Sequence, residues 1–178
     1  MCTNPVWPDL VRLATMFRER MSKQAKDPMG TNSLLLFLCT GNYYRSRFVE
    51  LLFNYQATQA SLSWQAESRG IALEFGVNNR GPISSAALAV LHERGIVPPE
   101  SIRFPQQVQE ENFRLAQRII ALDEAEHHSL LVHRFSRWLE RVEFWQVPDM
   151  PRTSVADGVA LMTSQVQELV RTLAGLAA

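Results

Sequence analysis

Short apolar runs recur along the chain from residue 34 onwards, and stretches with helical spacing of apolar residues separate them. The first run, Leu-Leu-Leu-Phe-Leu over residues 34–38, has no polar interruption, as expected for a strand covered on both faces. Strands that alternate with helices of this length favour an α/β fold, with a parallel sheet and helices on both faces. We predict strands over residues 34–38, 64–71, 118–122 and 142–147.

Four helices are predicted between and after these strands. The first follows the Gly-Asn turn at residues 41–42, with Ser46 as its N-cap. The second begins at Pro82 and runs to about Arg94, followed by Gly95 as a left-handed cap. The acid-x-x-Glu spacing over residues 123–126 is typical of a capping box that opens the third. The last helix carries a single apolar seam, made of Val155, Val159, Met162, Val166, Leu169 and Leu173.

The first 32 residues differ from the rest of the chain. Apolar residues at helical spacing are followed by a polar stretch from Ser22 to Ser33, which indicates an amphipathic helix and a linker. The helix either packs on the main domain or docks a partner or a second subunit. We therefore predict an N-terminal extension over residues 1–32 and one catalytic domain over residues 33–178.

Charge and cysteine content exclude several classes of protein. The 178 residues carry 18 basic and 18 acidic side chains, so no global field draws the protein to nucleic acid or to acidic membranes. Cys2 and Cys39 are the two cysteines, too few for a disulfide framework or a cysteine-based zinc site, and they fit a reducing cytosol. No apolar run reaches the roughly 18 residues of a membrane span, and the N-terminus lacks a signal-peptide pattern. We expect a cytoplasmic protein.

Histidines and aromatic residues add no further candidate site. The spacing of His127, His128 and His133 does not place them on one helix face as metal ligands, and a solvated helix face is the favoured interpretation. The aromatic residues are not interleaved with a basic stripe, so RNA binding is not expected. We predict no metal, no cofactor and no nucleic-acid partner.

The most informative segment reads Cys-Thr-Gly-Asn-Tyr-Tyr-Arg-Ser over residues 39–46 and lies between a buried strand and a helix N-terminus. A loop in that place directs backbone N–H groups at one point, and the helix dipole adds positive potential, so an oxyanion such as phosphate is favoured. Gly41 and Asn42 are the residues that best tolerate left-handed backbone there.

Three side chains of this segment suit phosphate chemistry. The field of the loop favours the thiolate of Cys39, a nucleophile. Arg45 can return over the loop and hold two phosphate oxygens with its planar guanidinium, and Ser46 can donate its hydroxyl to the thiolate. Without further context, Cys39 also fits a buried core cysteine that ends a strand.

The segment resembles the low-molecular-weight protein tyrosine phosphatase family, which carries a Cys-x5-Arg-Ser loop after its first strand. Further segments are similar in the same order: Ser-Arg-Gly at 68–70, Ile-Ala-Leu-Asp at 120–123 and Val-Pro-Asp at 147–149. The resemblance covers residues 33–178 and implies a three-layer sandwich with a central four-stranded parallel sheet.

The resemblance also implies residue roles. Cys39 would attack phosphorus and form a phosphocysteine, Arg45 and the loop amides would stabilise the transferring group, and Asp149 would act as general acid and then as base. Asn42 would hold the loop in its strained shape. The phosphate-binding loop would comprise Thr40, Gly41, Asn42, Tyr43, Tyr44 and Ser46.

The chain departs from the family at several positions. Tyr44 replaces a second cysteine, Arg47 replaces a proline, and Met-Pro-Arg at 150–152 lacks the aromatic residues that usually follow the aspartate. We expect Tyr44 to pack under the loop and Tyr43 to line the pocket. Protein-arginine phosphatases of the family carry a threonine where this chain has Tyr43, which disfavours phosphoarginine as substrate.

The expected activity is therefore phosphomonoester hydrolysis, on a phosphorylated protein or a small aryl phosphate, by a monomer or weak homodimer. One alternative is a pseudophosphatase or phosphate-binding interaction module. Another is an arsenate reductase, which could only use an external thiol because no cysteine follows Cys39.

Overall fold

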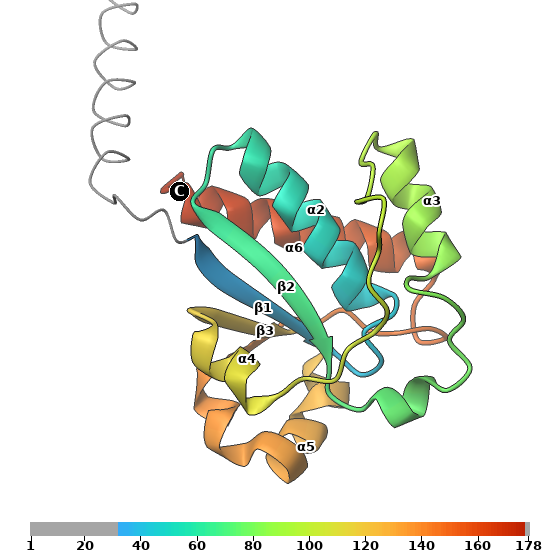
Figure 1. Ribbon diagram of the computed structural model, residues 1–178, viewed down its shortest axis with the longest axis vertical. Helices are drawn as coiled ribbons and strands as arrows, with labels where there is room; N and C mark the ends of the chain where they lie inside the picture. Colours follow the sequence, from blue (N-terminus) through green and yellow to red (C-terminus); the bar gives the residue numbers. More distant parts are fainter. Residues whose placement is uncertain (1–31, 177–178) are drawn as a thin grey trace, which may run out of the picture. The chain divides into compact units, whose positions relative to one another are not determined.

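A computed structural model describes residues 32–176 and contains one parallel sheet in the order β2-β1-β3-β4 (Figure 1). The predicted extension over residues 1–32 lies outside the described residues, apart from Asn32. The strands are β1 (Ser33–Cys39), β2 (Trp64–Gly70), β3 (Arg118–Ala121) and β4 (Val142–Phe144).

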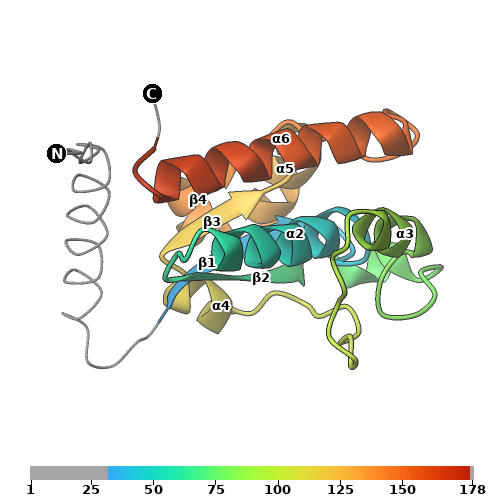
Figure 2. The same ribbon diagram turned by 90° about the horizontal axis from the view of Figure 1, so that it is seen from above.

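Helices cover both faces of the sheet and produce the three-layer sandwich that the family resemblance implied. α2 and α6 lie together on one face, and α4 and α5 lie on the other (Figures 1 and 2). Within residues 32–176, no helix has the length and apolarity needed to cross a bilayer. The helices are α2 (Arg45–Gln59), α3 (Ser85–Glu93), α4 (Glu110–Leu115), α5 (Glu124–Phe135) and α6 (Val155–Leu173), with 3-10 turns η1 (Leu73–Gly76) and η2 (Ser136–Arg141).

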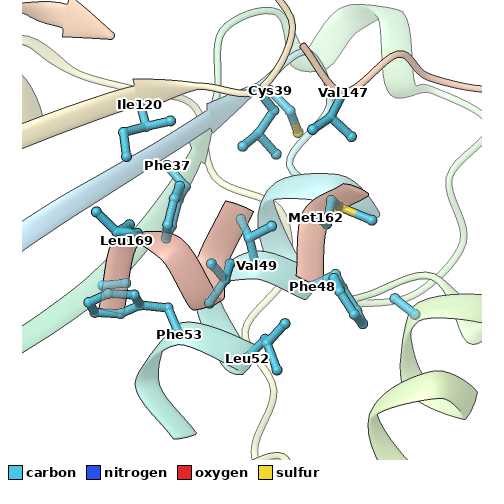
Figure 3. Packing of buried hydrophobic residues seen from close by; sticks show 14 of the residues in the cluster. Phe37, Cys39, Phe48, Val49, Leu52, Phe53, Ile120, Val147, Met162 and Leu169 are labelled. Carbon is cyan, nitrogen blue, oxygen red and sulfur yellow. The ribbon is translucent and has the colours of Figure 1, made fainter. Parts of the chain in front are cut away.

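Two apolar clusters hold the layers together, because successive side chains of a strand point to opposite faces. Leu35 and Phe37 of β1 belong to the cluster under α2 and α6, whereas Leu36 and Leu38 belong to the cluster under α4 and α5. Cys39 is a member of the first cluster, and Figure 3 shows it where β1 ends. The same view shows the side chains of Phe48, Val49, Leu52, Phe53, Met162 and Leu169.

The four predicted strands and the final helix are confirmed. In α6 the seam residues Val159, Met162, Val166 and Leu169 are buried, as their spacing predicted. β4 is shorter than predicted, but its pairing continues beyond Phe144: Trp145 N donates to Ala121 O, and Val147 N donates to Leu122 O.

Two helix starts differ from the prediction. α3 begins at Ser85 rather than Pro82, because the backbone at Ser84 is still extended, with ψ of 133°. Gly95 does take the left-handed conformation expected after this helix, with φ of 70°. In α2 the residue before the helix is Tyr44, so Ser46 lies inside the first turn and is not the N-cap.

The capping box predicted over residues 123–126 is wrong. Asp123 precedes α5, but its side chain makes no capping hydrogen bond. Its carboxylate pairs with Arg152, and the Glu126 carboxylate pairs with Arg45. The solvated histidine face is wrong at one position: His127 is fully buried, whereas His128 is exposed.

Candidate active site

The connection between β1 and α2 folds around the sulfur of Cys39. The backbone N–H of Asn42 donates to Cys39 Sγ at 3.2 Å, and the Ser46 hydroxyl lies 2.9 Å from the same sulfur. Asn42 has a φ of 48°, in the left-handed region that the sequence predicted for this turn. Polar hydrogens directed at sulfur stabilise negative charge there, so the local geometry suits a thiolate.

The side chain of Asn42 fixes this backbone conformation. Its Nδ2 donates to Ser46 Oγ at 3.0 Å and to Ser68 Oγ at 2.8 Å. Its Oδ1 accepts from Arg103 Nη1 at 2.9 Å and from the backbone N–H of Gln106 at 3.0 Å. The nitrogen and the oxygen of this buried side-chain amide therefore both have hydrogen-bond partners. Apart from Ser46, those partners lie outside the Cys39 loop.

Arg45 begins α2 and is 2% exposed. Its Nη1 donates to Val147 O at 3.1 Å, and its Nη2 lies 2.8 Å from a carboxylate oxygen of Glu126 and 2.8 Å from Asp149 Oδ2. Burial lowers the pKa of Arg45, but the negative charges of Cys39, Asp149 and Glu126 outweigh that effect and raise it overall. The guanidinium is therefore a permanent cation beside the Cys39 loop.

Asp149 follows Val147 and Pro148 and is brought to the loop by its ion pair with Arg45. Its side chain is 42% exposed, and its Oδ1 accepts the backbone N–H of Met150 at 2.9 Å. Asp149 is thus at once in contact with the buried arginine and open to the cavity. The structure therefore brings Cys39, Arg45 and Asp149 together at one cavity.

Glu126 is a site residue that the sequence analysis missed. It is bound by both Arg45 and the hydroxyl of Thr40. Burial would raise the pKa of Glu126, but the nearby His127 imidazole, whose Nε2 lies 3.5 Å away, and the charge of Arg45 lower it well below its ordinary value. Glu126 does belong to a recognisable pattern, the acid-x-x-Glu spacing over residues 123–126, but that spacing predicts a helix cap and not a partner for Arg45.

Tyr43 and Tyr44 both line the cavity above Cys39. The Tyr43 hydroxyl donates to Arg80 O at 2.7 Å, in keeping with the expected pocket-lining position. Tyr44 also packs against the apolar cluster under α2 and α6, as expected, and its hydroxyl is buried without a hydrogen-bond partner. Burial and the nearby charge of Asp149 raise the pKa of Tyr44.

An open cavity of about 900 Å³ lies over the loop. Cys39, Thr40, Gly41 and Arg45 line its floor, while Asn42 and Ser46 are buried behind the loop and do not reach it. The rest of the lining comes mainly from η1 and the residues that follow it, from α5, and from the segment after Asp149. These lining residues include Phe75, Asn79, Met150, Pro151 and Arg152.

Phe75 supplies an aromatic surface that the sequence analysis did not find. The segment after Asp149 lacks the aromatic residues usual in the family, but Phe75 of η1 lies at the rim with 67% of its surface exposed. Met150 is also exposed there, at 53%. No group of three or more potential metal ligands occurs among residues 32–176.

The chain is thus an α/β protein in which a loop containing Cys39 and followed by Arg45 lies at the carboxyl edge of a parallel sheet. The family model for low molecular weight phosphotyrosine protein phosphatases matches residues 34–176. The chain belongs to this family.

Solved structures of this family share the fold. A low molecular weight protein tyrosine phosphatase from T. tengcongensis is 22% identical, with a TM-score of 0.65 over 79% of this chain and 99% of that one. Wzb of Vibrio vulnificus in complex with benzylphosphonate is 18% identical, with a TM-score of 0.66 over 79% and 98%. The YwlE arginine phosphatase from Geobacillus stearothermophilus is 21% identical, with a TM-score of 0.58 over 80% and 91%. Comparison with curated proteins gave no match.

Proposed function

We propose that the chain hydrolyses phosphate monoesters, with protein phosphotyrosine or a small aryl phosphate as substrate, through a phosphocysteine on Cys39. The observation that carries the proposal is the convergence of three groups on one cavity. A sulfur that accepts hydrogen bonds, a buried arginine and a half-exposed aspartate face the same space. These are a nucleophile, an oxyanion partner and a proton donor.

In the first step the Cys39 thiolate attacks phosphorus and the bond from phosphorus to the leaving oxygen breaks. Asp149, in its protonated form, gives its proton to that oxygen, so the alcohol leaves neutral. Loop N–H groups and Arg45 hold the equatorial oxygens. Asp149 Oδ2 lies 2.8 Å from Arg45 Nη2, so a phosphate that binds this nitrogen takes the place of the carboxyl group and frees it for the leaving oxygen.

In the second step the Asp149 carboxylate takes a proton from water, and the water oxygen attacks phosphorus. The phosphorus–sulfur bond breaks, inorganic phosphate leaves, and Cys39 returns as a thiolate. The Ser46 hydroxyl, 2.9 Å from the sulfur, stabilises the thiolate as it departs. Asp149 thus acts in both steps: it loses its proton in the first step and regains one from water in the second.

An aryl substrate suits the rim of the cavity. Phe75 and Met150 are exposed apolar groups at the mouth, and Tyr43 adds a ring beside the loop. An aromatic ring attached to phosphate would cover these surfaces, which favours aryl over alkyl esters. A reactive thiol also requires a reducing compartment, so we further propose that the enzyme acts in the cytosol.

Oxyanion binding without turnover is the second candidate. The observation in its favour is that Glu126 and Asp149 both contact Nη2 of Arg45. If Asp149 stays on the arginine after an anion enters, it cannot reach the leaving oxygen, and the chain acts as a phosphate-binding module.

Turnover of p-nitrophenyl phosphate by wild type, Cys39→Ser and Asp149→Ala tests the proposal. We expect no detectable activity in Cys39→Ser and a loss of about 10²–10⁴-fold in Asp149→Ala, the usual range for a general acid. Cys2→Ser is the matched control and should retain wild-type turnover. Full activity in Cys39→Ser would overturn the mechanism, and wild type that binds vanadate without turnover would establish the second candidate.

A further inference from the structure

The long connection between α3 and α4 contributes an arginine to the back of the anion loop. Residues 103–108, called here the strap, run past the end of β2: Gly70 N donates to Gln106 O, and Val108 N donates to Gly70 O, both at 2.8 Å. The strap lies behind the loop rather than over the cavity, since none of its residues lines the cavity. Its first residue is Arg103.

We propose that Arg103 is a positioning residue that holds Asn42 in its left-handed conformation and thereby fixes the backbone N–H directed at Cys39. This inference rests on the proposed function only for the role of Cys39 Sγ as the nucleophile. It assigns Arg103 no contact with substrate.

Apart from a long bond of 3.4 Å to the neighbouring Phe104 carbonyl, the contacts of the Arg103 side chain converge on the back of the loop. Nη1 donates to Asn42 Oδ1 at 2.9 Å, and Nη2 donates to the Ser68 carbonyl at 2.6 Å. Nη2 also reaches Ser68 Oγ at 3.2 Å and Glu50 Oε2 at 3.1 Å. One guanidinium therefore ties the loop to α2 and to the end of β2 simultaneously, a task for which its planar array of donors is suited.

Asn42 needs such a tie because its backbone conformation is costly for a residue with a side chain. The side chain is completely buried, so losing one of the two donors to Oδ1 leaves an under-satisfied polar atom. The same residue presents its N–H to Cys39 Sγ. A relaxed Asn42 would turn that N–H away from the sulfur.

Charge balance at the strap supports a fixed rather than a mobile Arg103. Glu50 accepts from Arg47 at 2.7 Å and from the Ser68 hydroxyl at 2.5 Å, besides Arg103. Burial lowers the pKa of Arg103 to about 10, with Glu50 opposing that shift and Arg47 adding to it. Arg103 therefore remains charged at neutral pH and keeps its charge-assisted bonds to the loop.

The test uses the rate at which iodoacetamide alkylates the Cys39 thiol, in a Cys2→Ser background so that one thiol remains. This readout needs neither turnover nor a bound anion, so it stands even if the proposed hydrolysis fails. We expect Arg103→Gln to slow alkylation at pH 7 at least about threefold, because an N–H that stabilises the thiolate is lost. For active enzyme, kcat should fall more than KM rises.

Arg118→Gln is the matched control, because Arg118 also pairs with a glutamate, Glu143, at the opposite end of β3. It should alkylate at the wild-type rate. Equal alkylation rates in Arg103→Gln and Arg118→Gln would overturn the proposal. If Arg103→Gln does not fold, Arg103→Lys decides: a single ammonium cannot satisfy Asn42, Ser68 and Glu50 together, so wild-type behaviour in Arg103→Lys would also overturn it.

A double-mutant cycle separates positioning from general stability. Asn42→Gly removes the side chain that Arg103 holds, and glycine adopts the left-handed conformation without strain. In the Asn42→Gly background, Arg103→Gln should change the alkylation rate less than about 1.5-fold, since its target is gone. An undiminished effect there would show that Arg103 acts by another route.

Discussion

Arg45 combines almost complete burial with contacts to two carboxylates. A cation removed from water is costly unless it is paired, and here Glu126 and Asp149 both pair with it. The two acids differ in access to the cavity: Glu126 is 25% exposed and Asp149 is 42% exposed. We infer that Glu126 is the permanent partner, whereas Asp149 is the one that an incoming anion displaces.

His127 lies next to Glu126, one of the two carboxylates that pair with Arg45. Its Nδ1 accepts the backbone N–H of Asp123 at 3.1 Å, which places the proton of the neutral ring on Nε2, 3.5 Å from Glu126. Burial, together with the charge of Arg45, lowers the pKa of His127 despite the opposing effect of Glu126. The folded protein therefore holds a neutral imidazole at pH values where the unfolded chain protonates.

The free energy of unfolding should depend on pH through this residue. Above the ordinary histidine pKa of about 6.5, the ring is neutral in both the folded and the unfolded protein, so it does not change the free energy of unfolding. Below that pH only the unfolded chain is protonated. The free energy of unfolding then falls by up to about 1.4 kcal/mol per pH unit, until the lowered pKa of His127 in the folded protein is reached. Urea unfolding at pH 7.5, 6.5 and 5.5 should show a steeper loss in wild type than in His127→Gln. His128→Gln, at an exposed position, should keep the wild-type slope. Parallel slopes in wild type and His127→Gln would contradict the assignment.

At the residue scale, the sequence is most informative where the candidate site is contiguous. The segment from Cys39 to Ser46 holds eight adjacent residues between a strand and a helix, and its resemblance to a known family added to what that position indicates. Glu126, Phe75 and Arg103 come from three other connections and reach the loop only through the fold. The spacing of Glu126 even favoured a local role, which long-range pairing with Arg45 overrides.

At the scale of elements, hydrophobic pattern and length decided what could be predicted. β1 is a pure apolar run and α6 is long with one seam, so both were found with nearly correct ends. α4 has six residues and the 3-10 turns are as short or shorter, too short to show a period. The start of α3 was misplaced because a proline suits both a first helical turn and an extended lead-in.

The seam of α6 gives a quantitative prediction about packing. Met162 is completely buried against the cluster under α2, whereas its neighbour Leu161 is 41% exposed. Met162→Ala should lower the free energy of unfolding by about 2–4 kcal/mol, through lost burial and the cavity left behind. Leu161→Ala should cost under about 1 kcal/mol, because most of its side chain remains in water. Urea denaturation of both variants compares them, and equal losses would show that the seam is placed wrongly.

At the scale of the whole molecule, the topology places the site. All four strands are parallel, so β1, β3 and the extension of β4 deliver Cys39, Asp123 and Val147 to one edge of the sheet. The loop also joins the central strand β1 to the core helix α2, whose Phe48 and Phe53 are fully buried. An anion that binds in the loop as proposed would therefore be coupled to the cooperative unfolding of the domain.

Inorganic phosphate should raise the melting temperature through this coupling. At a concentration 100 times its Kd, a ligand that binds only the folded state adds about 2.7 kcal/mol. For a domain of this size that corresponds to roughly 5–10 °C. Thermal melts with phosphate, against sodium chloride of equal ionic strength, should show the shift in wild type. Arg45→Gln should show none, and an equal shift in that variant would mean that the anion binds elsewhere.

Several segments line the cavity, and they differ in how closely they contact Asp149. The β1–α2 connection supplies one side of the cavity, while η1, α5 and residues 150–152 supply most of the rest of its lining. Residues 150–152 contact the groups below: Met150 N–H donates to Asp149 Oδ1, and Arg152 pairs with Asp123 and Glu126. Phe75 of η1 is 67% exposed at the same mouth. Substitutions at Phe75 should therefore change the apolar surface of the mouth with less effect on Asp149 than substitutions at residues 150–152.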